Sequence, residues 1–266
     1  MQELIEISLE NHIDIIMIAE SENLDMQYFL SGLRKNGKIF TQIELLPKKR
    51  GLTLFANESL EVLIYKEEKY FTAYKVHNNG KKYLLFVTHF TSPMYKGESA
   101  RVQRANTLYR TIEKMESACN EVETQTGKRK YNSIVVGDFN LQPFSDGIIG
   151  IHGFNAIMDA NKAKKGSRTF GESNVRFFYN PMWHLMGKHD GILGTYYCET
   201  DQEDKSFYWY TFDQVLLRPE LIDEFVWDEF EIIKKIGNKT LIKNNRIYKE
   251  KFSDHLPIKF KIGYGG

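Results

Sequence analysis

Acidic, amide and imidazole side chains follow several apolar segments of this sequence. The run Ile134–Val136 leads into Gly137-Asp138-Phe139-Asn140, so a carboxylate and a carboxamide stand two positions apart. Because side chains alternate along extended backbone, Asp138 and Asn140 would emerge on the same side of a strand end. They can present an anion and an amide to one ligand. Asp and Asn also cap turns and helices, so the pair alone leaves a structural role equally open.

The other candidate residues share this position at the end of an apolar strand. The full set is Glu20, His89, Asp138 with Asn140, Asp213, and Asp254 with His255. Scattered surface acids would have no reason to follow apolar runs, so we interpret these residues as one site. Carboxylates suit Mg²⁺ or Mn²⁺, and two cysteines with scattered histidines offer no zinc cluster. Magnesium with a carboxylate-activated water, opposite a histidine that binds a phosphoryl oxygen, is typical of phosphoester hydrolysis.

Short strands and one long helix must position these residues. Alternating β-branched and aromatic segments, divided by turn residues such as Pro47 and Asn78-Asn79-Gly80, predict antiparallel hairpins. Helical spacing predicts a short helix over residues 1–12 and the strongest helix over 98–120. Residues 141–194 hold most of the loop signals. The predicted strands are 13–19, 38–46, 51–56, 60–65, 69–76, 82–89, 134–136, 206–217 and 256–262, with edge structure over 222–248.

Length and composition limit the class of protein. With 266 residues and 42% apolar content, the chain fits one domain with a large core. No stretch approaches the ~18 consecutive apolar residues of a membrane span. The formal net charge of +1 gives no general attraction for nucleic acid. Two cysteines and the lack of a signal-peptide pattern predict an intracellular, cytoplasmic location.

Four motifs together resemble the endonuclease/exonuclease/phosphatase superfamily, the deoxyribonuclease-I-like proteins. Asp14–Glu20 is similar to the strand that ends in Gln-Glu, and Gly137–Asn140 matches Gly-Asp-Phe/Leu-Asn. Phe212–Val215 matches Tyr/Phe-Asp-x-Ile/Val, and Ser253–Ile258 matches Ser-Asp-His-x-Pro-Ile/Val. The motifs occur in the family's order from about Ile13 to the C-terminus. The resemblance implies a four-layer α/β/β/α sandwich, two mixed β-sheets packed face to face with helices outside, and metal-dependent phosphoester hydrolysis.

The resemblance also implies roles for the acidic residues and their amide partner. Glu20 would be the main Mg²⁺ ligand, with Asp254 as a second or outer-shell metal partner. Asp138 would orient or activate the attacking water. Asn140 would hold Asp138 and the phosphate.

The histidines receive phosphate-binding roles by the same resemblance. His255 would contact the scissile phosphate, paired with Asp213, which fixes its tautomer and favours its protonated form. His89 resembles a family histidine that hydrogen-bonds a phosphate oxygen. A histidine satisfied within the core is the alternative for His89.

One expected element is missing from the sequence. Family members begin with a core strand that carries an Asn supporting the metal site, and no such strand precedes the helix that starts at Met1. We expect residues 1–266 to form a single domain whose true start lies upstream of Met1. If the chain begins at Met1, we expect weakened metal affinity.

Basic segments supply little evidence for a nucleic-acid surface. Arg101 and Arg104 can bind phosphate, but we interpret them as solvated helix charges. Lys48-Lys49-Arg50 and Lys162–Arg168 have acidic neighbours, which makes a nucleic-acid patch the less favoured reading.

The substrate stays open among three classes. A phosphodiesterase or nuclease acting on DNA or RNA ranks first, and a phosphatase or phospholipid-cleaving phosphodiesterase second. A catalytically weak phosphate-binding or nucleic-acid-binding module is the third. The aromatic segments Phe177–Trp183 and Phe207–Trp209 can stack bases or cover the core, and we favour the core.

Overall fold

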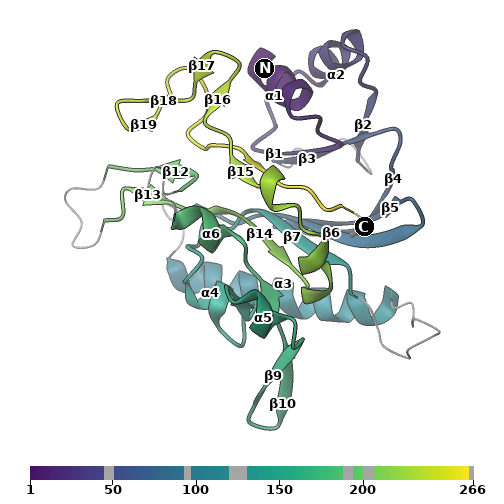
Figure 1. Ribbon diagram of the computed structural model, residues 1–266, viewed down its shortest axis with the longest axis vertical. Helices are drawn as coiled ribbons and strands as arrows, with labels where there is room; N and C mark the ends of the chain where they lie inside the picture. The colour runs from purple at the N-terminus through teal and green to yellow at the C-terminus, as the bar shows by residue number, and fades with distance from the viewer. Residues whose placement is uncertain (45–50, 93–96, 120–130, 188–193, 200–205, 264–266) are drawn as a thin grey trace.

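Seven strands form the larger sheet of the computed structural model, which describes residues 1–44, 51–92, 97–119, 131–187, 194–199 and 206–263 (Figure 1). Lys48-Lys49-Arg50 lies outside these residues. Antiparallel pairing joins β4, β5 and β6, parallel pairing joins β6 to β7, and β14 runs antiparallel to β7. The sheet is therefore mixed. Its order is β4 (Glu61–Glu67), β5 (Phe71–Asn78), β6 (Lys81–His89), β7 (Ser133–Asp138), β14 (Asp213–Leu217), β11 (Phe178–Tyr179) and β8 (Ala156–Ile157).

The second sheet layer is divided. One part has the order β1-β3-β2, from β1 (Ile15–Ala19), β3 (Leu52–Asn57) and β2 (Phe40–Ile43), with antiparallel pairing throughout. The other part pairs β15 (Glu231–Ile232) with β20 (Ile258–Lys259). Within the described residues β1 and β20 are each the last strand of their sheet. Four further hairpins are β9 (Ser167–Phe170) with β10 (Ser173–Arg176), β12 (Tyr196–Tyr197) with β13 (Trp209–Tyr210), β16 (Lys235–Ile236) with β17 (Lys239–Thr240), and β18 (Ile242–Lys243) with β19 (Arg246–Ile247).

Helices cover the outer faces of both sheets. Phe29 and Leu33 of α2 (Met26–Lys35) and Ile5 of α1 (Gln2–Glu10) pack on Ile16 and Phe55 of the smaller sheet. On the opposite side, α3 (Glu98–Cys119) lies along the seven-stranded sheet (Figure 1). The predicted α/β/β/α sandwich is confirmed. The shorter helices are α4 (Asp146–Ile149), α5 (Ala160–Ala163), α6 (Met182–Met186) and the 3₁₀ turns Pro219–Glu224 and Trp227–Glu229.

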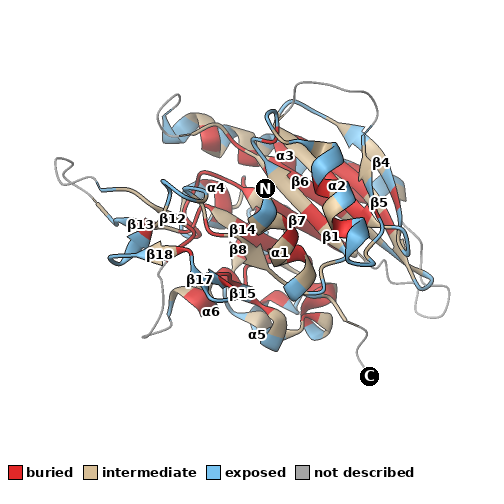
Figure 2. Ribbon diagram, turned by 90° about the horizontal axis from the view of Figure 1, so that it is seen from above, coloured by how far each residue is buried: buried red, intermediate tan, exposed pale blue. Residues whose placement is uncertain are grey.

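The central strand β7 is buried on both faces, as its β-branched run predicts. Ile134 and Val136 contribute to the core between the sheets, which also contains Leu54 of β3. Val135 packs with the core that contains Leu108 of α3. Figure 2 shows the buried residues gathered in these inner layers. No helix among the described residues is long and apolar enough to cross a membrane.

Two predicted strands are shorter than expected, and the helices α2, α4, α5 and α6 had no prediction. Residues 206–217 form β13 and β14 rather than one strand, because β13 pairs with β12 whereas β14 pairs with β7. The expected strand 256–262 is reduced to β20. The α2 helix lacked a prediction, although Asp25 caps it by accepting a bond from the Tyr28 amide. The other predicted strands and the helix 98–120 are confirmed to within a few residues.

A buried ion pair joins α3 to the end of β14. Arg218 is fully buried and donates to both carboxylate oxygens of Glu116, at 2.8 and 2.9 Å. It also donates to the Phe177 carbonyl at 2.9 Å. Arg176 adds a bond to Glu116 at 3.0 Å. This network fixes the long helix against the strand that carries Asp213.

Replacement of Glu116 by Ala should lower the free energy of unfolding by about 3–5 kcal/mol, because it leaves the Arg218 charge buried without its counterion. Thermal or urea unfolding followed by circular dichroism measures the loss. Lys114→Ala, an exposed change on the same helix, should stay within about 0.5 kcal/mol of the unsubstituted protein. Equal stability of both variants would show that the pair contributes nothing net.

Candidate active site

The ends of three adjacent strands bring the candidate residues into one row. Asp138 ends β7, and the parallel register with β6 sets His89 beside it. The antiparallel register with β14 sets Asp213 on its other side. The predicted convergence of strand ends is therefore present for Asp138, His89 and Asp213.

Gly137 allows β6 and β7 to approach closely beside the site. Its φ is +138°, and an added Cβ would lie 2.0 Å from the Thr88 carbonyl oxygen. No larger side chain fits there without moving β6. Asn140 adopts φ +48°, a left-handed conformation that Asn tolerates better than most residues. The backbone geometry of this motif therefore favours glycine at position 137 and asparagine at position 140, in addition to any chemical role.

Asn140 fixes the Asp138 carboxylate from both sides. Its backbone amide donates to Asp138 Oδ1 at 2.7 Å, and its side-chain Nδ2 donates to Oδ2 at 2.6 Å. Nδ2 also donates to the Phe90 carbonyl at 2.9 Å. Burial raises the pKa of Asp138 to about 7, and the nearby charge of Asp213 adds to this, while the Asn140 amide bond opposes it. Asp138 can therefore exchange a proton near neutral pH.

His255 and Asp213 form the second fixed pair. His255 Nδ1 lies 2.7 Å from Asp213 Oδ2, and the Tyr196 ring packs 4.9 Å from the imidazole. Burial lowers the pKa of His255, but the charge and hydrogen bond of Asp213 outweigh it and raise the pKa to about 9. The imidazolium then donates through Nδ1 to Asp213. Ser253 shapes the turn by accepting the His255 amide at 3.1 Å.

His89 lies between the Asp138 and Glu20 carboxylates. Its Nε2 is 3.6 Å from Asp138 Oδ2 and 3.8 Å from Glu20 Oε1. Burial lowers the pKa of His89, although the charge of Glu20 works in the opposite direction. A neutral imidazole here can donate to, or accept from, a group bound between the two acids. His89 thus lies in the site rather than only in the core.

Glu20 and Asp254, the two predicted metal ligands, are more exposed than the other candidate residues. Glu20 follows β1 with φ +54°, and its side chain is 79% exposed. Asp254 is exposed beside His255, whose pKa its charge helps to raise. No group of three His, Cys, Asp or Glu side chains converges on a point suitable for a metal in the described part of the chain. Mg²⁺ usually takes only one or two protein carboxylates and keeps several waters, so the Glu20 oxygens are suitable donors.

Further residues support the site without having been predicted. Thr195 Oγ1 accepts the Asp213 amide at 3.1 Å, and Gln142 Oε1 accepts the Thr211 amide at 3.0 Å. Tyr196 packs on His255. Among these residues the sequence could have indicated only Gln142, because it comes two positions after Asn140. Thr195 and Tyr196 carried none, because their partners lie far along the chain.

The interpretation of Arg101 and Arg104 as solvated charges is wrong. Arg101 on α3 is only 8% exposed. Burial lowers its pKa, and the negative charges of Glu98 and Asp138 oppose this by raising it. Arg104 donates to the Thr91 hydroxyl and lies 4.0 Å over the Tyr70 ring. Arg101 is thus enclosed by the protein, and Arg104 contacts residues that flank β5 and β6.

The aromatic segments divide into two kinds. Phe177, Phe178 and Tyr179 are buried, which confirms the prediction that they cover the core. Phe207 and Tyr208 are 53% and 39% exposed, so the same prediction is wrong for them. They precede the short strand β13, and among the described residues both side chains are exposed to solvent.

Comparison with solved structures supports the fold. An endonuclease/exonuclease/phosphatase family protein from Leptotrichia buccalis matches with a TM-score of 0.53 and 15% identity, over 98% of this chain and 92% of that one. Truncated Caenorhabditis elegans TDP2 matches with a TM-score of 0.55 and 14% identity, over 98% and 89%. The endonuclease domain of the retrotransposon TRAS1 matches at 0.51 and 12%, over 100% and 93%.

No protein-family model and no curated protein sequence matches this chain. The identities to the solved structures are low, so their likeness establishes the three-dimensional arrangement. The chain has the fold of the endonuclease/exonuclease/phosphatase proteins, as its motifs predicted.

Asp138→Asn should stabilise the protein above neutral pH, because it removes a buried charge. The Asp138 pKa rises from 3.8 to about 7 on folding. The stability that comes with its protonated form is complete below pH 3.8 and is lost as the pH rises through 7. The variant should therefore gain about 1–3 kcal/mol at pH 8. The gain in stability should be smaller than the free energy that corresponds to the whole pKa shift. The introduced asparagine side chain would place one of its N–H groups against an N–H donor of Asn140.

Urea unfolding of both proteins at pH 5 and pH 8, with EDTA present, measures the difference. The gain should shrink at pH 5, where Asp138 is already mostly protonated. An equal gain at both pH values would contradict the raised pKa.

Proposed function

We propose that this chain is a Mg²⁺-dependent hydrolase of phosphoester bonds, and that a phosphodiester of the nuclease type is its substrate. One observation carries the proposal: the buried Asp138, held by Asn140, stands in one row with His89 and the His255–Asp213 pair. A base and an imidazolium at neighbouring positions are what water attack on phosphorus requires.

Asp138 acts as the base for the attacking water. Its two oxygens are held by Asn140, and the attacking water would lie beside His89, whose Nε2 is 3.6 Å from Asp138 Oδ2. Asp138 accepts a proton as the water oxygen bonds to phosphorus. The phosphorus–oxygen bond to the alcohol then breaks, and the departing oxygen takes a proton from solvent. A pKa near 7 matches this base to neutral pH.

His255 and His89 stabilise the phosphate oxygens. The His255 imidazolium, oriented through Nδ1 by Asp213, directs its free Nε2–H toward the substrate. It offers a full positive charge where negative charge develops. His89 can add a neutral donor between Asp138 and Glu20. Asn140 and Asp213 are positioning residues in this scheme.

Glu20 would hold the metal, with Asp254 as a second or water-mediated ligand. Bound Mg²⁺ would supply electrostatic stabilisation of the phosphoryl oxygens. Mg²⁺ is preferred to Zn²⁺ because the acidic oxygens are the donors nearest the site, and Mn²⁺ could replace it.

Two alternative functions keep separate support. A phosphatase or phospholipid-cleaving enzyme could use the same base and imidazolium. A catalytically weak binding module is favoured by the high exposure of Glu20, the principal metal ligand. The nuclease class is preferred because the TRAS1 neighbour is an endonuclease domain.

Hydrolysis should be measured with Mg²⁺ on DNA, RNA, small phosphodiesters, phosphomonoesters and lipid head groups. Asp138→Ala and His255→Ala should each lower the rate by about 10²–10³, since each removes a base or a charge used in the transition state. EDTA should abolish the activity. His152→Ala, an exposed histidine outside the site, serves as the control. Full activity of either site variant would refute the assignment, and folded protein without any Mg²⁺-stimulated hydrolysis would favour the binding module.

We also propose that residues 1–266 form one domain whose smaller sheet takes a further strand beside β1. The sequence of β1, Ile-Ile-Met-Ile-Ala, is typical of a central strand, yet β1 is the last strand of its sheet in the described residues. Edge strands normally carry charges or prolines that prevent pairing. A strand preceding α1 could reach this edge by a parallel crossover through the helix.

If the reading frame continues before Met1, the residues encoded there should supply this strand. A protein extended by them should melt at a higher temperature and bind Mg²⁺ more tightly than residues 1–266, because β1 gains a hydrogen-bonded neighbour next to Glu20. Calorimetry and Mg²⁺ titration compare the two. Identical melting and metal affinity would rule the strand out.

A further inference from the structure

A continuous series of aromatic rings leads away from His255. The Tyr196 ring lies 4.9 Å from the imidazole and stacks on Phe212 at 5.5 Å. Tyr210 lies 5.1 Å from Phe212 and 5.9 Å from Phe207. These contacts connect the proposed catalytic histidine to the surface of the protein.

Phe144 continues the series beyond Phe207. Its ring is 5.7 Å from Phe207 and 6.1 Å from Trp183. Phe207 is 53% exposed and Phe144 is 38% exposed, whereas Phe212 is buried. Adjacent exposed aromatic rings on a protein surface commonly mark a binding site. We call Tyr196, Phe212, Tyr210, Phe207 and Phe144 the aromatic track.

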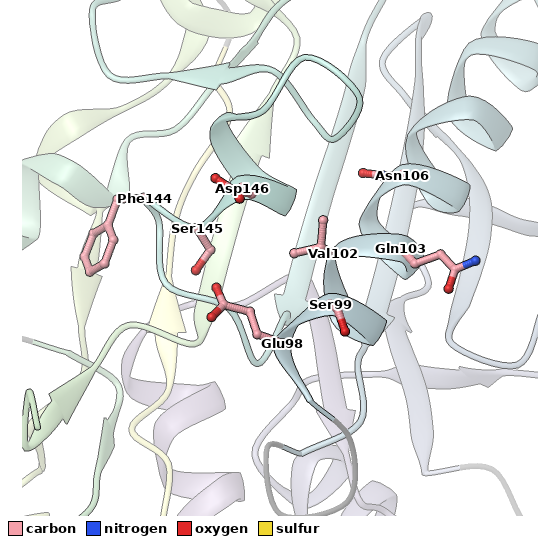
Figure 3. A pocket seen from close by; sticks show the side chains of 8 residues that line it. All are labelled: Glu98, Ser99, Val102, Gln103, Asn106, Phe144, Ser145 and Asp146. Atoms are coloured by element: carbon pink, nitrogen blue, oxygen red, sulfur yellow. The ribbon is translucent and has the colours of Figure 1, made fainter. Parts of the chain in front are cut away.

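A hollow of about 560 Å³ adjoins the outer end of the aromatic track. It lies between the first turns of α3 and the segment that enters α4 (Figure 3). Phe144 and Val102 supply the apolar part of its lining. Figure 3 shows the Glu98 carboxylate extending toward Ser145 and Asp146 across the hollow. The hollow thus combines flat apolar walls with hydrogen-bond acceptors.

The charges of the hollow favour a nucleobase over a phosphate. Glu98 and Asp146 are its charged lining residues, and both would repel a phosphate. Their oxygens can accept hydrogen bonds from the amino groups of adenine, cytosine and guanine. Thymine and uracil lack such an amino group. A base can enter while its phosphate stays outside, away from the Glu98 and Asp146 carboxylates.

We propose that the exposed rings of the aromatic track, Phe207 and Phe144, and the hollow bind unpaired bases of a single-stranded polynucleotide, with an amino-bearing base preferred in the hollow. The inference rests on the proposed function for the position of the scissile phosphate. Bases stack on exposed rings largely regardless of sequence, and the acids of the hollow add a preference.

A duplex cannot use this surface without losing base pairs. Both faces of each base are stacked within the helix, so no face is free to stack on Phe144 or Phe207. A base must leave the duplex before it can contact Phe144. Single strands therefore should bind more tightly than duplexes of the same sequence.

Binding can be tested separately from hydrolysis. Fluorescence anisotropy in EDTA should compare fluorescein-labelled single strands rich in adenine and cytosine with their duplexes, with thymine-rich strands and with abasic strands. DNA and RNA versions of each strand determine which sugar is accepted. The protein should bind the base-bearing single strand about tenfold more tightly than the abasic one, as loss of stacking implies.

Substitutions identify the surface. Phe144→Ala and Phe207→Ala should each weaken binding of the single strand about tenfold, and Phe144→Trp should retain it because a ring remains. Glu98→Gln with Asp146→Asn should remove the preference over thymine. Phe170→Ala, which changes a phenylalanine 60% exposed on β9, is the matched control and should leave binding unaltered.

Equal binding of base-bearing, abasic and duplex DNA would overturn the inference, and so would unaltered binding by folded Phe144→Ala and Phe207→Ala variants. Failure of the proposed function has a different signature. In that case the protein would not hydrolyse a small phosphodiester such as bis(p-nitrophenyl) phosphate with Mg²⁺, while base-dependent binding in EDTA persists.

Discussion

The hydrogen bonds between Asn140 and Asp138 are the interaction on which the site depends. They fix a carboxylate at the end of a fully buried strand, where an unsupported charge would be costly. Burial and the charge of Asp213 raise the pKa of Asp138, and the Asn140 amide prevents a larger rise. The result is an acid that can change protonation near neutral pH while its geometry stays fixed. The strained turn at Gly137 and Asn140 is the conformational cost of this placement.

The two strands beside β7 set the chemistry around Asp138. β6 supplies His89, whose pKa is lowered by burial, and β14 supplies Asp213, which raises the pKa of His255. Two histidines in one site are thus driven toward opposite protonation states by their surroundings. Such separation of pKa values is the usual way in which a protein assigns acid, base and donor roles. The Arg218–Glu116 network keeps β14 and α3 in register with this arrangement.

The two sheets contribute unequally to the site. The seven-stranded sheet is continuous and places His89, Asp138 and Asp213 side by side, whereas the divided second sheet holds Glu20 at the end of an edge strand. The proposed metal ligand is therefore the most exposed member of the site. The aromatic track starts at the His255 side, opposite Glu20, so base binding and metal binding would approach the phosphate from different directions.

The sequence alone determined where most of the longer strands lie along the chain, the polar residues at their ends and the fold class, because buried β-branched runs and short motifs are local patterns. It also predicted Asp138, Asn140, Asp213 and His255 as neighbours, and the structure brings them together. Only the tertiary structure decided that Arg101 is buried, that Phe207 is exposed and that strand 206–217 divides. These properties depend on contacts between segments far apart in the chain. A periodic pattern tells which face of a segment is apolar, but not which other segment will cover it.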